Sequence, residues 1–210
     1  MTRKSLLFVG VLAVAALALF THQAVSQSVE GFEELDPAEG MKRWMESAKL
    51  GEPHKFLEQF VGDWDTEMTM WMAGPGSPPT KSKGTARWYW LMEGRWLAGE
   101  SQGVMMGMPL KGFYVLGYDN FRRKFVNMAI NSMGTEMLTS SGNASRDRKS
   151  LILYGQMNEP MTGEVGKTVK WAWRFISEDE HLFEAHDLVI DENDCKVFEI
   201  RYTRKKEEGK

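Results

Sequence analysis

The clearest pattern in this chain is an alternation of apolar and polar side chains that begins at Gly62. One face of the segment would carry Trp64, Thr66, Met68, Met70 and Met72, and the other would carry Asp65, Glu67 and Thr69. A period of two residues is that of a β-strand, because successive side chains point to opposite sides of a sheet. The segment therefore predicts a strand with one apolar and one polar face, and only Trp71 breaks the alternation.

Further strand-like segments follow at intervals of about 8–15 residues, separated by turn-forming residues. The predicted strands span residues 63–73, 83–91, 95–104, 110–118, 123–130, 135–143, 149–157, 166–176, 181–190 and 195–204. A two-sheet sandwich would fit this number of strands equally well. Because no long crossover connection is visible, we expect a mainly β fold, a closed antiparallel up-and-down β-barrel of about ten strands. The interior of such a barrel can hold a ligand.

Two short helices are predicted before the first strand. Asp36 is a suitable N-cap, Pro37 a suitable first helical residue, and Gly51 a C-terminal stop. Apolar residues recur at helical spacing between them, at Met41, Trp44, Met45 and Ala48. A second helix is expected over residues 53–60, with Phe56, Leu57 and Phe60 on one side. We interpret these helices as a lid or plug over one barrel end, and a loosely attached N-terminal arm is the alternative.

Residues 1–26 have the pattern of a secretory signal peptide. Arg3 and Lys4 precede an apolar run over residues 6–20, and Ala24-Val25-Ser26 predicts cleavage before Gln27. A retained membrane anchor is the alternative, but the run is shorter than the roughly 18 residues that a membrane span needs. The expected organisation is a signal peptide (1–26), a helical lead-in (27–60) and a β-barrel domain (61–206). We expect an exported protein, periplasmic or secreted.

The charge and the single cysteine limit the partners of the mature chain. Without Arg3 and Lys4 it would carry 24 basic and 29 acidic residues, a net charge of −5. An acidic surface disfavours nucleic acid and anionic membranes. We expect neither partner once the signal is removed. Cys195 has no second cysteine to pair with, so a half-buried thiol at a strand start is expected, with a Cys195-bridged dimer as the alternative.

The sequence contains no Gly-x-Ser-x-Gly, Walker, His-Glu-x-x-His or Cys-x-x-Cys motif, and we predict no catalytic residue and no metal site. His181 and His186 are five residues apart on a predicted strand, which places them on opposite faces and prevents them from sharing one metal ion. A single histidine can be the axial ligand of a haem, as in the ten-stranded nitrobindin-type barrels. A haem-binding or enzymatic barrel that uses His186 is therefore an alternative, although the fuller glycine pattern of those barrels is missing.

The composition favours an apolar interior. Fifteen Met and eight Trp are many for 210 residues, and flexible Met side chains suit an adaptable apolar cavity as well as an ordinary aromatic core. Glu100 and Glu199 lie in strands of mixed polarity. A glutamate inside the barrel that faces Arg174 or Arg201 would form a buried pair able to orient a polar ligand, and an outward-facing strand pair is the favoured alternative.

We therefore predict non-catalytic binding of a small apolar molecule, with no cofactor. The hypothetical ligand-binding residues are Trp64, Met68, Met70, Trp96, Glu100, Trp171, Trp173, Arg174 and His186. A structural or protein-interaction module, with the N-terminal helices as its contact surface, is the alternative from another class. The sequence leaves the oligomeric state open.

The Gly62-Asp63-Trp64 tripeptide resembles the Gly-x-Trp of lipocalin-like (calycin) barrels. Alone it is a weak motif, since Gly94-Arg95-Trp96 repeats it, but its place after a short helix and at the head of the first strand matches those proteins. The resemblance implies that Trp64 seals the barrel base and that a late-strand arginine, Arg201 or Arg204, packs on it by a cation–π contact.

A closer resemblance covers nearly the whole mature chain. The matching segments are His54-Lys55-Phe56-Leu57, Phe60-Val61-Gly62-Asp63-Trp64, Gly74-Pro75-Gly76, Pro78-Pro79, Gly94-Arg95-Trp96-Leu97, Leu116-Gly117-Tyr118-Asp119, Gly166-Lys167-Thr168, Glu199-Ile200 and Tyr202-Thr203-Arg204. In this order they resemble the bacterial domain-of-unknown-function 1579 family (DUF1579). The resemblance implies a lipocalin-like barrel that is exported or cytoplasmic, and it implies no activity, ligand or catalytic residue.

Overall fold

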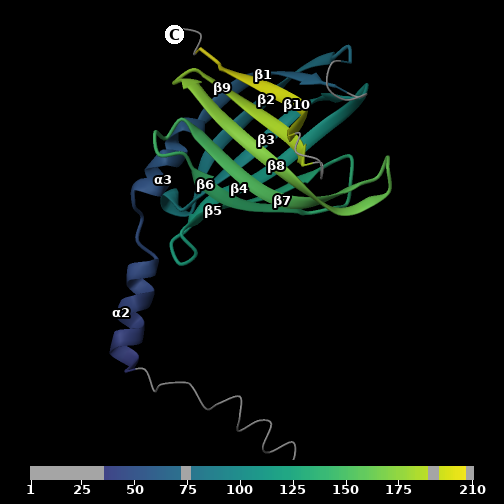
Figure 1. The fold of residues 1–210 in the computed structure, drawn as a ribbon. Coiled ribbons are helices and arrows are strands. Elements are labelled where there is room, and N and C mark those ends of the chain that lie inside the picture. Colours follow the sequence, from purple (N-terminus) through teal and green to yellow (C-terminus); the bar gives the residue numbers. More distant parts are fainter. Residues whose placement is uncertain (1–35, 72–76, 189–193, 207–210) are drawn as a thin grey trace, which may run out of the picture. The chain divides into compact units, whose positions relative to one another are not determined.

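The computed structural model describes residues 36–71, 77–188 and 194–206 (Figure 1). The predicted signal peptide, Met72 and the Gly74-Pro75-Gly76 segment lie outside these residues. The chain divides into two compact units, residues 1–47 and residues 48–210, and each is considered separately.

Ten antiparallel strands form one closed barrel in the second unit. They are β1 (Gly62–Met70), β2 (Thr80–Leu91), β3 (Trp96–Met105), β4 (Met108–Asp119), β5 (Lys124–Asn131), β6 (Leu138–Ala144), β7 (Ser150–Glu159), β8 (Glu164–Ser177), β9 (Glu180–Leu188) and β10 (Asp194–Arg204). Each strand pairs with its neighbours in sequence, and β1 pairs with β10 from Trp64↔Arg204 to Met70↔Phe198. The predicted up-and-down barrel is thus confirmed, and the sandwich is excluded.

One end of the barrel is sealed by α3 (Glu52–Phe56) and the short 3₁₀ helix η1 (Leu57–Phe60), with η2 (Met92–Gly94) in the β2–β3 connection. Phe56, Leu57 and Phe60 are each at most 2% exposed and belong to the hydrophobic core. The Phe60 carbonyl also accepts a hydrogen bond from Trp64 Nε1 at 2.8 Å. The second predicted helix is therefore a plug, and we call this end of the barrel the sealed end and the opposite one the far end.

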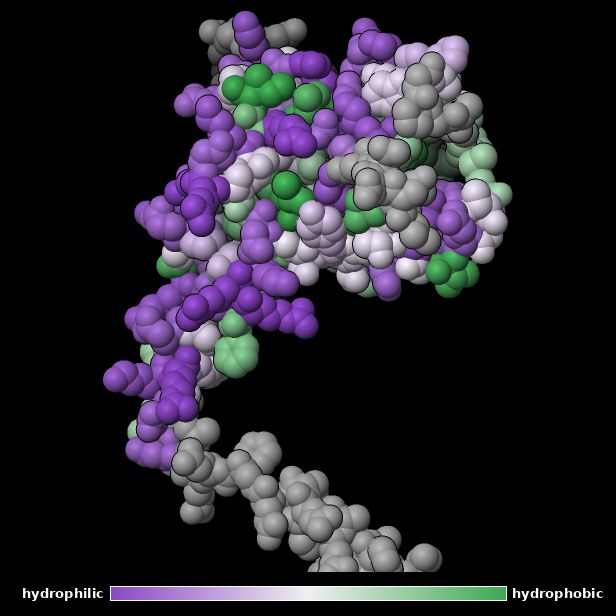
Figure 2. All heavy atoms as spheres, in the orientation of Figure 1, coloured by the Kyte–Doolittle hydropathy of each residue, from purple (hydrophilic) through white to green (hydrophobic). Residues whose placement is uncertain are grey.

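The helix α2 (Pro37–Ser47) belongs to the first unit. The Asp36 carboxylate accepts a hydrogen bond from the Ala38 N–H at 3.0 Å, as expected of an N-cap. The prediction that Gly51 ends this helix is wrong, because Gly51 is extended (φ −145°) and is itself the N-cap of α3. No residue of α2 is buried, and polar side chains dominate its visible face in Figure 2. None of the described helices has the length and apolar character that crossing a bilayer requires.

Strand register and burial together show which side chains line the lumen. In β1 the buried Trp64 and Met70 share a face, and in β8 Val169 and Trp173 are buried while Arg174 is exposed. Following the register around the barrel, even-numbered residues face inward in β1, β2, β4, β6 and in β10 from Phe198. Odd-numbered residues face inward in β3, β5, β7, β9 and, between its two register shifts, in β8 from Lys167 to Phe175.

Candidate functional site

The half of the lumen next to the sealed end is filled by its own aromatic side chains. Trp64 is fully buried, and Trp88 and Trp173 are 3% and 7% exposed. The Arg204 guanidinium carbon lies 4.2 Å from the centre of the Trp64 ring, so the expected cation–π contact is made by Arg204. Trp64 and Trp173 therefore act as core residues in this structure and present almost no surface to a ligand.

His181 lies inside this aromatic core. It is 1% exposed, its ring stacks on Tyr202 at 4.6 Å, and it meets the Trp64 ring edge-on at 4.3 Å. Its Nε2 has no hydrogen-bond partner among the described residues. Burial, and secondarily the positive charge of Arg204, lower the pKa of His181 to about 3, so the imidazole is neutral at physiological pH.

A small cavity of about 40 Å³, lined by both polar and apolar side chains, adjoins the aromatic core. Its lining includes Thr66, Met68, Ser82, Ser101, Tyr114 and Tyr202. The Ser101 and Tyr114 hydroxyls share a hydrogen bond at 3.1 Å, and burial raises the pKa of Tyr114 and Tyr202, so both phenols keep their protons. One water needs roughly 10–15 Å³ by this measure, whereas small-molecule pockets span about 300–1,000 Å³. The cavity can hold a few waters but not a whole organic ligand.

The far half of the lumen presents large apolar side chains that are not fully covered. Met68, Trp171, Phe183, Phe198 and Ile200 face inward and are partly exposed. The Trp171 and Phe183 rings stack 5.9 Å apart with an interplanar angle of 14°, and Phe198 lies 6.0 Å from Phe183. Of the predicted site residues, Met68, Met70 and Trp171 lie in this half of the lumen, and Met70 itself is 7% exposed.

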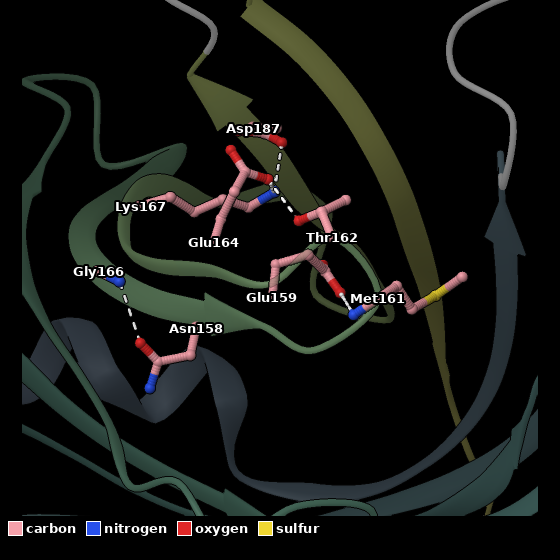
Figure 3. A network of polar contacts seen from close by, with 8 residues as sticks. All are labelled: Asn158, Glu159, Met161, Thr162, Glu164, Gly166, Lys167 and Asp187. Carbon is pink, nitrogen blue, oxygen red and sulfur yellow. Dashed lines mark hydrogen bonds and ion pairs between the residues drawn. The ribbon is translucent and has the colours of Figure 1, made fainter.

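A charged pair stands at the rim of this apolar region (Figure 3). Lys167 Nζ lies 2.7 Å from Asp187 Oδ2 and 3.4 Å from Glu164 Oε2, and the Lys167 and Asp187 side chains are 17% and 29% exposed. Burial alone would lower the pKa of Lys167, but the contacts with both carboxylates raise it, so the ammonium stays charged. Among the inward strand positions described in the far half, the charged ones are Lys167, Asp187 and, where β7 ends and β8 begins, Glu159 and Glu164. Cys195, half-buried as predicted, lies opposite Asp187 in the register.

Four of the predicted site residues lie on the outer face of the barrel: Trp96, Glu100, Arg174 and His186. The exposed Glu100 accepts a hydrogen bond from the Tyr89 hydroxyl at 2.8 Å. These four side chains therefore do not contribute to a site inside the lumen, because neighbouring residues of a strand point to opposite sides of the sheet. His181 and His186 are accordingly on opposite faces, as predicted. Since His186 lies outside the lumen, the geometry does not support it as the ligand of a haem held inside the barrel.

His186 belongs to a charged cluster on the outer face of β8, β9 and β10. Glu184 Oε2 lies 2.6 Å from Arg174 Nε and 3.5 Å from His186 Nε2, and Lys196 approaches Glu184 Oε1 at 3.4 Å. Burial would raise the pKa of Glu184, but the hydrogen bonds and charges of Arg174 and Lys196 lower it. Burial is the main cause that lowers the pKa of His186, and the positive charge of Lys170 lowers it further. The described residues include no group of three or more His, Cys, Asp or Glu side chains that could hold a metal ion.

Trp96 lines an outer groove of about 340 Å³ over β3, β4, β5 and β6. Val115, Arg122, Val126, Met128 and Thr139 are among the other residues of the groove. The Trp96 ring lies against Gly117, where an added Cβ would come within 2.3 Å of Trp96 Cε3. This groove is at the lower end of the size range of small-molecule pockets.

The chain matches the family described as "Protein of unknown function (DUF1579)" over residues 49–204, which includes the whole barrel. The chain belongs to this family. A comparison with curated proteins gives no match for the DUF1579 protein. The family assignment agrees with the resemblance seen in the sequence, and the family description supplies no activity.

Solved structures with similar folds are distant in sequence. Rv2717c from M. tuberculosis is 14% identical, with 75% of this chain and 100% of that chain covered and a TM-score of 0.48. The S-type phycobiliprotein lyase CPES from Guillardia theta is 10% identical, with 72% and 92% covered and a TM-score of 0.49. EF1p2_mFAP2b bound to DFHBI is 11% identical, with 73% and 100% covered and a TM-score of 0.38.

Proposed function

We propose that this DUF1579 barrel binds a small, largely apolar molecule in the far half of its lumen and does not convert it chemically. The observation that carries the proposal is the partial exposure of the stacked Trp171 and Phe183 rings inside the barrel. A ligand that covers such surface gains about 25 cal/mol for each Å² of apolar area removed from water. The Ser101 and Tyr114 hydroxyls and the Lys167–Asp187 pair supply the few polar groups that orient a ligand in sites of this kind.

Titration of the purified protein with the lipophilic dye N-phenyl-1-naphthylamine tests this proposal. Replacing Trp171 by leucine is expected to weaken dye binding about tenfold, while the matched outer-face variant Trp96→Leu leaves it unchanged. Native mass spectrometry of protein purified from its own host should also detect a bound small molecule. The proposal would be refuted if the protein carries no bound small molecule and does not bind the dye.

The outer groove at Trp96 is a second candidate for the same kind of ligand, because its volume of about 340 Å³ exceeds that of the inner cavity. It lies over the outer face and contains Arg122 at one edge. The two sites make opposite predictions for the same variants. Loss of dye binding in Trp96→Leu, with no change in Trp171→Leu, would assign the ligand to the groove.

We also propose that the protein is exported and acts in the periplasm or outside the cell. The support is the leader pattern alone, with Arg3 and Lys4 ahead of the apolar run over residues 6–20. N-terminal sequencing of protein recovered from the periplasm or the medium of its bacterial host is expected to begin at Gln27. Recovery of the full chain from the cytoplasm would count against export.

A further inference from the structure

Among the described residues at the rim of the lumen, the carboxylates around Lys167 outnumber its single ammonium group. The single ammonium of Lys167 contacts two carboxylates, those of Asp187 and Glu164. Glu164 also accepts a hydrogen bond from the Thr162 hydroxyl at 2.7 Å, which holds it beside Lys167 (Figure 3). Because the Asp187 side chain is 29% exposed, it remains accessible to a charged group that enters from the far end. A cation arriving there would meet a local excess of negative charge.

The Asp187 carboxylate and the Trp171 and Phe183 rings lie in one line along β8 and β9. In the register Val169 lies opposite Asp187 and Trp171 opposite Ala185, so Trp171 is two residue steps deeper in the lumen than Asp187. Phe183 is four residues deeper on the same strand as Asp187. At about 3.3 Å per residue, these steps correspond to roughly 7 Å and 13 Å along the strand. A molecule of that length can touch the aromatic rings with one end and the carboxylate with the other.

We infer that the ligand is an amphipathic organic cation, with its apolar part against Trp171 and Phe183 and its ammonium group beside Asp187. The inference rests on the proposed function and adds the chemical class of the ligand to it. Aromatic ring faces attract cations through their quadrupole. The aromatic walls of the lumen and the carboxylates at its rim therefore both favour a positively charged ligand. The chain as a whole is acidic, with a net charge of −3, which favours the approach of a cation.

An anionic ligand is the competing possibility, because Lys167 faces inward. To bind a carboxylate, however, Lys167 would have to exchange its 2.7 Å contact with Asp187, and the anion would then lie beside two carboxylates. Like charges at such distances oppose each other, and partial burial strengthens the repulsion. The geometry therefore favours the cation.

Three ten-carbon probes of matched length separate these possibilities: decyltrimethylammonium, decanoate and uncharged decanol. Each is used below its micelle concentration at pH 7.5 and low salt, to displace N-phenyl-1-naphthylamine from the full protein. We expect decyltrimethylammonium to bind at least tenfold tighter than decanoate. Asp187→Asn should weaken binding of the cation about tenfold and leave decanol unchanged. Lys167→Met should strengthen binding of the cation, since Asp187 then loses its own counter-ion.

Glu67→Gln is the matched control, because Glu67 forms an ion pair with Lys81 at 2.9 Å on the outer face of β1. It should not change the preference for the cation. The inference is overturned if decanoate binds as tightly as the cation, or if the preference for the cation is unchanged in Asp187→Asn. In either case, binding of the dye and of decanol would still support the proposed function. If the wild-type protein binds neither the dye nor any probe, the proposed function itself fails.

Discussion

The guanidinium of Arg204 lies over the Trp64 ring, with its central carbon 4.2 Å from the ring centre, and the two residues face each other across the β1–β10 pair. The same guanidinium donates hydrogen bonds to the carbonyls of Val61 at 2.7 Å and of Glu178 at 2.9 Å. One side chain on the last strand thus connects the first strand, the plug and the β8–β9 turn. We conclude that Arg204 fastens the closure of the barrel at its sealed end.

Replacing Arg204 by methionine should therefore destabilise the fold. The substitution removes a cation–π contact and charged hydrogen bonds to two carbonyls, and we expect the free energy of unfolding to fall by about 2–3 kcal/mol. Urea denaturation measures this change. Arg201→Met is the matched control, because Arg201 is an exposed residue of the same strand that pairs with Glu180 on the outer face, and its loss should cost less than about 1 kcal/mol. Equal losses in both variants would contradict the assigned role of Arg204.

The buried His181 should make the protein sensitive to mild acid. Its pKa is about 3 in the folded state, against about 6.5 in an unfolded chain, so the unfolded state takes up a proton first as the pH falls. The stability linked to neutral His181 is complete above pH 6.5 and is lost as the pH falls towards 3. From pH 7.5 to pH 5 the expected loss is about 2 kcal/mol.

Urea unfolding of wild type and His181→Phe at pH 7.5 and pH 5 measures this contribution. Phenylalanine keeps an aromatic ring in the core but cannot be protonated, so the variant should lose about 2 kcal/mol less than wild type between the two pH values. The same loss in both proteins would mean that other groups cause the acid sensitivity.

The sequence predicts the fold well because the strands and turns of the barrel are visible as local sequence patterns. Alternation and turn residues place all ten strands within three residues of their observed ends, and Phe56, Leu57 and Phe60 predict the plug from their spacing. The end of α2 was predicted wrongly. A glycine after a helical pattern can end one helix or begin the next, and here the His54 side chain decides, since Nδ1 accepts a hydrogen bond from the Gly51 N–H at 3.1 Å.

The candidate site is harder to predict because residue type does not reveal which face of a strand looks inward. Trp96 and Trp171 are equally apolar, yet Trp96 lies on the outer face and Trp171 in the lumen. The rim pair was missed for the same reason. Lys167 shares its parity with Trp171, which would have placed it inside, but a lysine in a strand is normally assigned to solvent. Asp187 shares its parity with His181, and the register between β8 and β9 brings it to Lys167.

Gly99 should tolerate no side chain, because it provides the space for Trp88. A Cβ at this position would lie 2.6 Å from Trp88 Cζ3, and the ring has no room to move, since it is 3% exposed and packs on Tyr114 at 5.7 Å. We expect Gly99→Ala to lower the free energy of unfolding by about 1–3 kcal/mol. Gly103→Ala, four residues further along β3, is the control. The added Cβ would meet no atom closer than 3.7 Å, and the free energy of unfolding should change by less than about 0.5 kcal/mol. Chemical denaturation distinguishes these outcomes, and equal effects would refute the packing argument.

Truncation from the N-terminus should show where the barrel begins. A chain that starts at residue 48 lacks α2, which has no buried residue, and its thermal midpoint should stay within about 2 °C of that of the mature protein. A chain that starts at residue 57 also lacks Phe56, whose buried ring lies 5.2 Å from Phe125 and 5.5 Å from Phe175, and it should lose about 3–5 kcal/mol. If α2 is the contact surface for a protein partner, the shorter truncation keeps the fold and loses that partner, whereas a barrel that unfolds without α2 would show that α2 stabilises the domain.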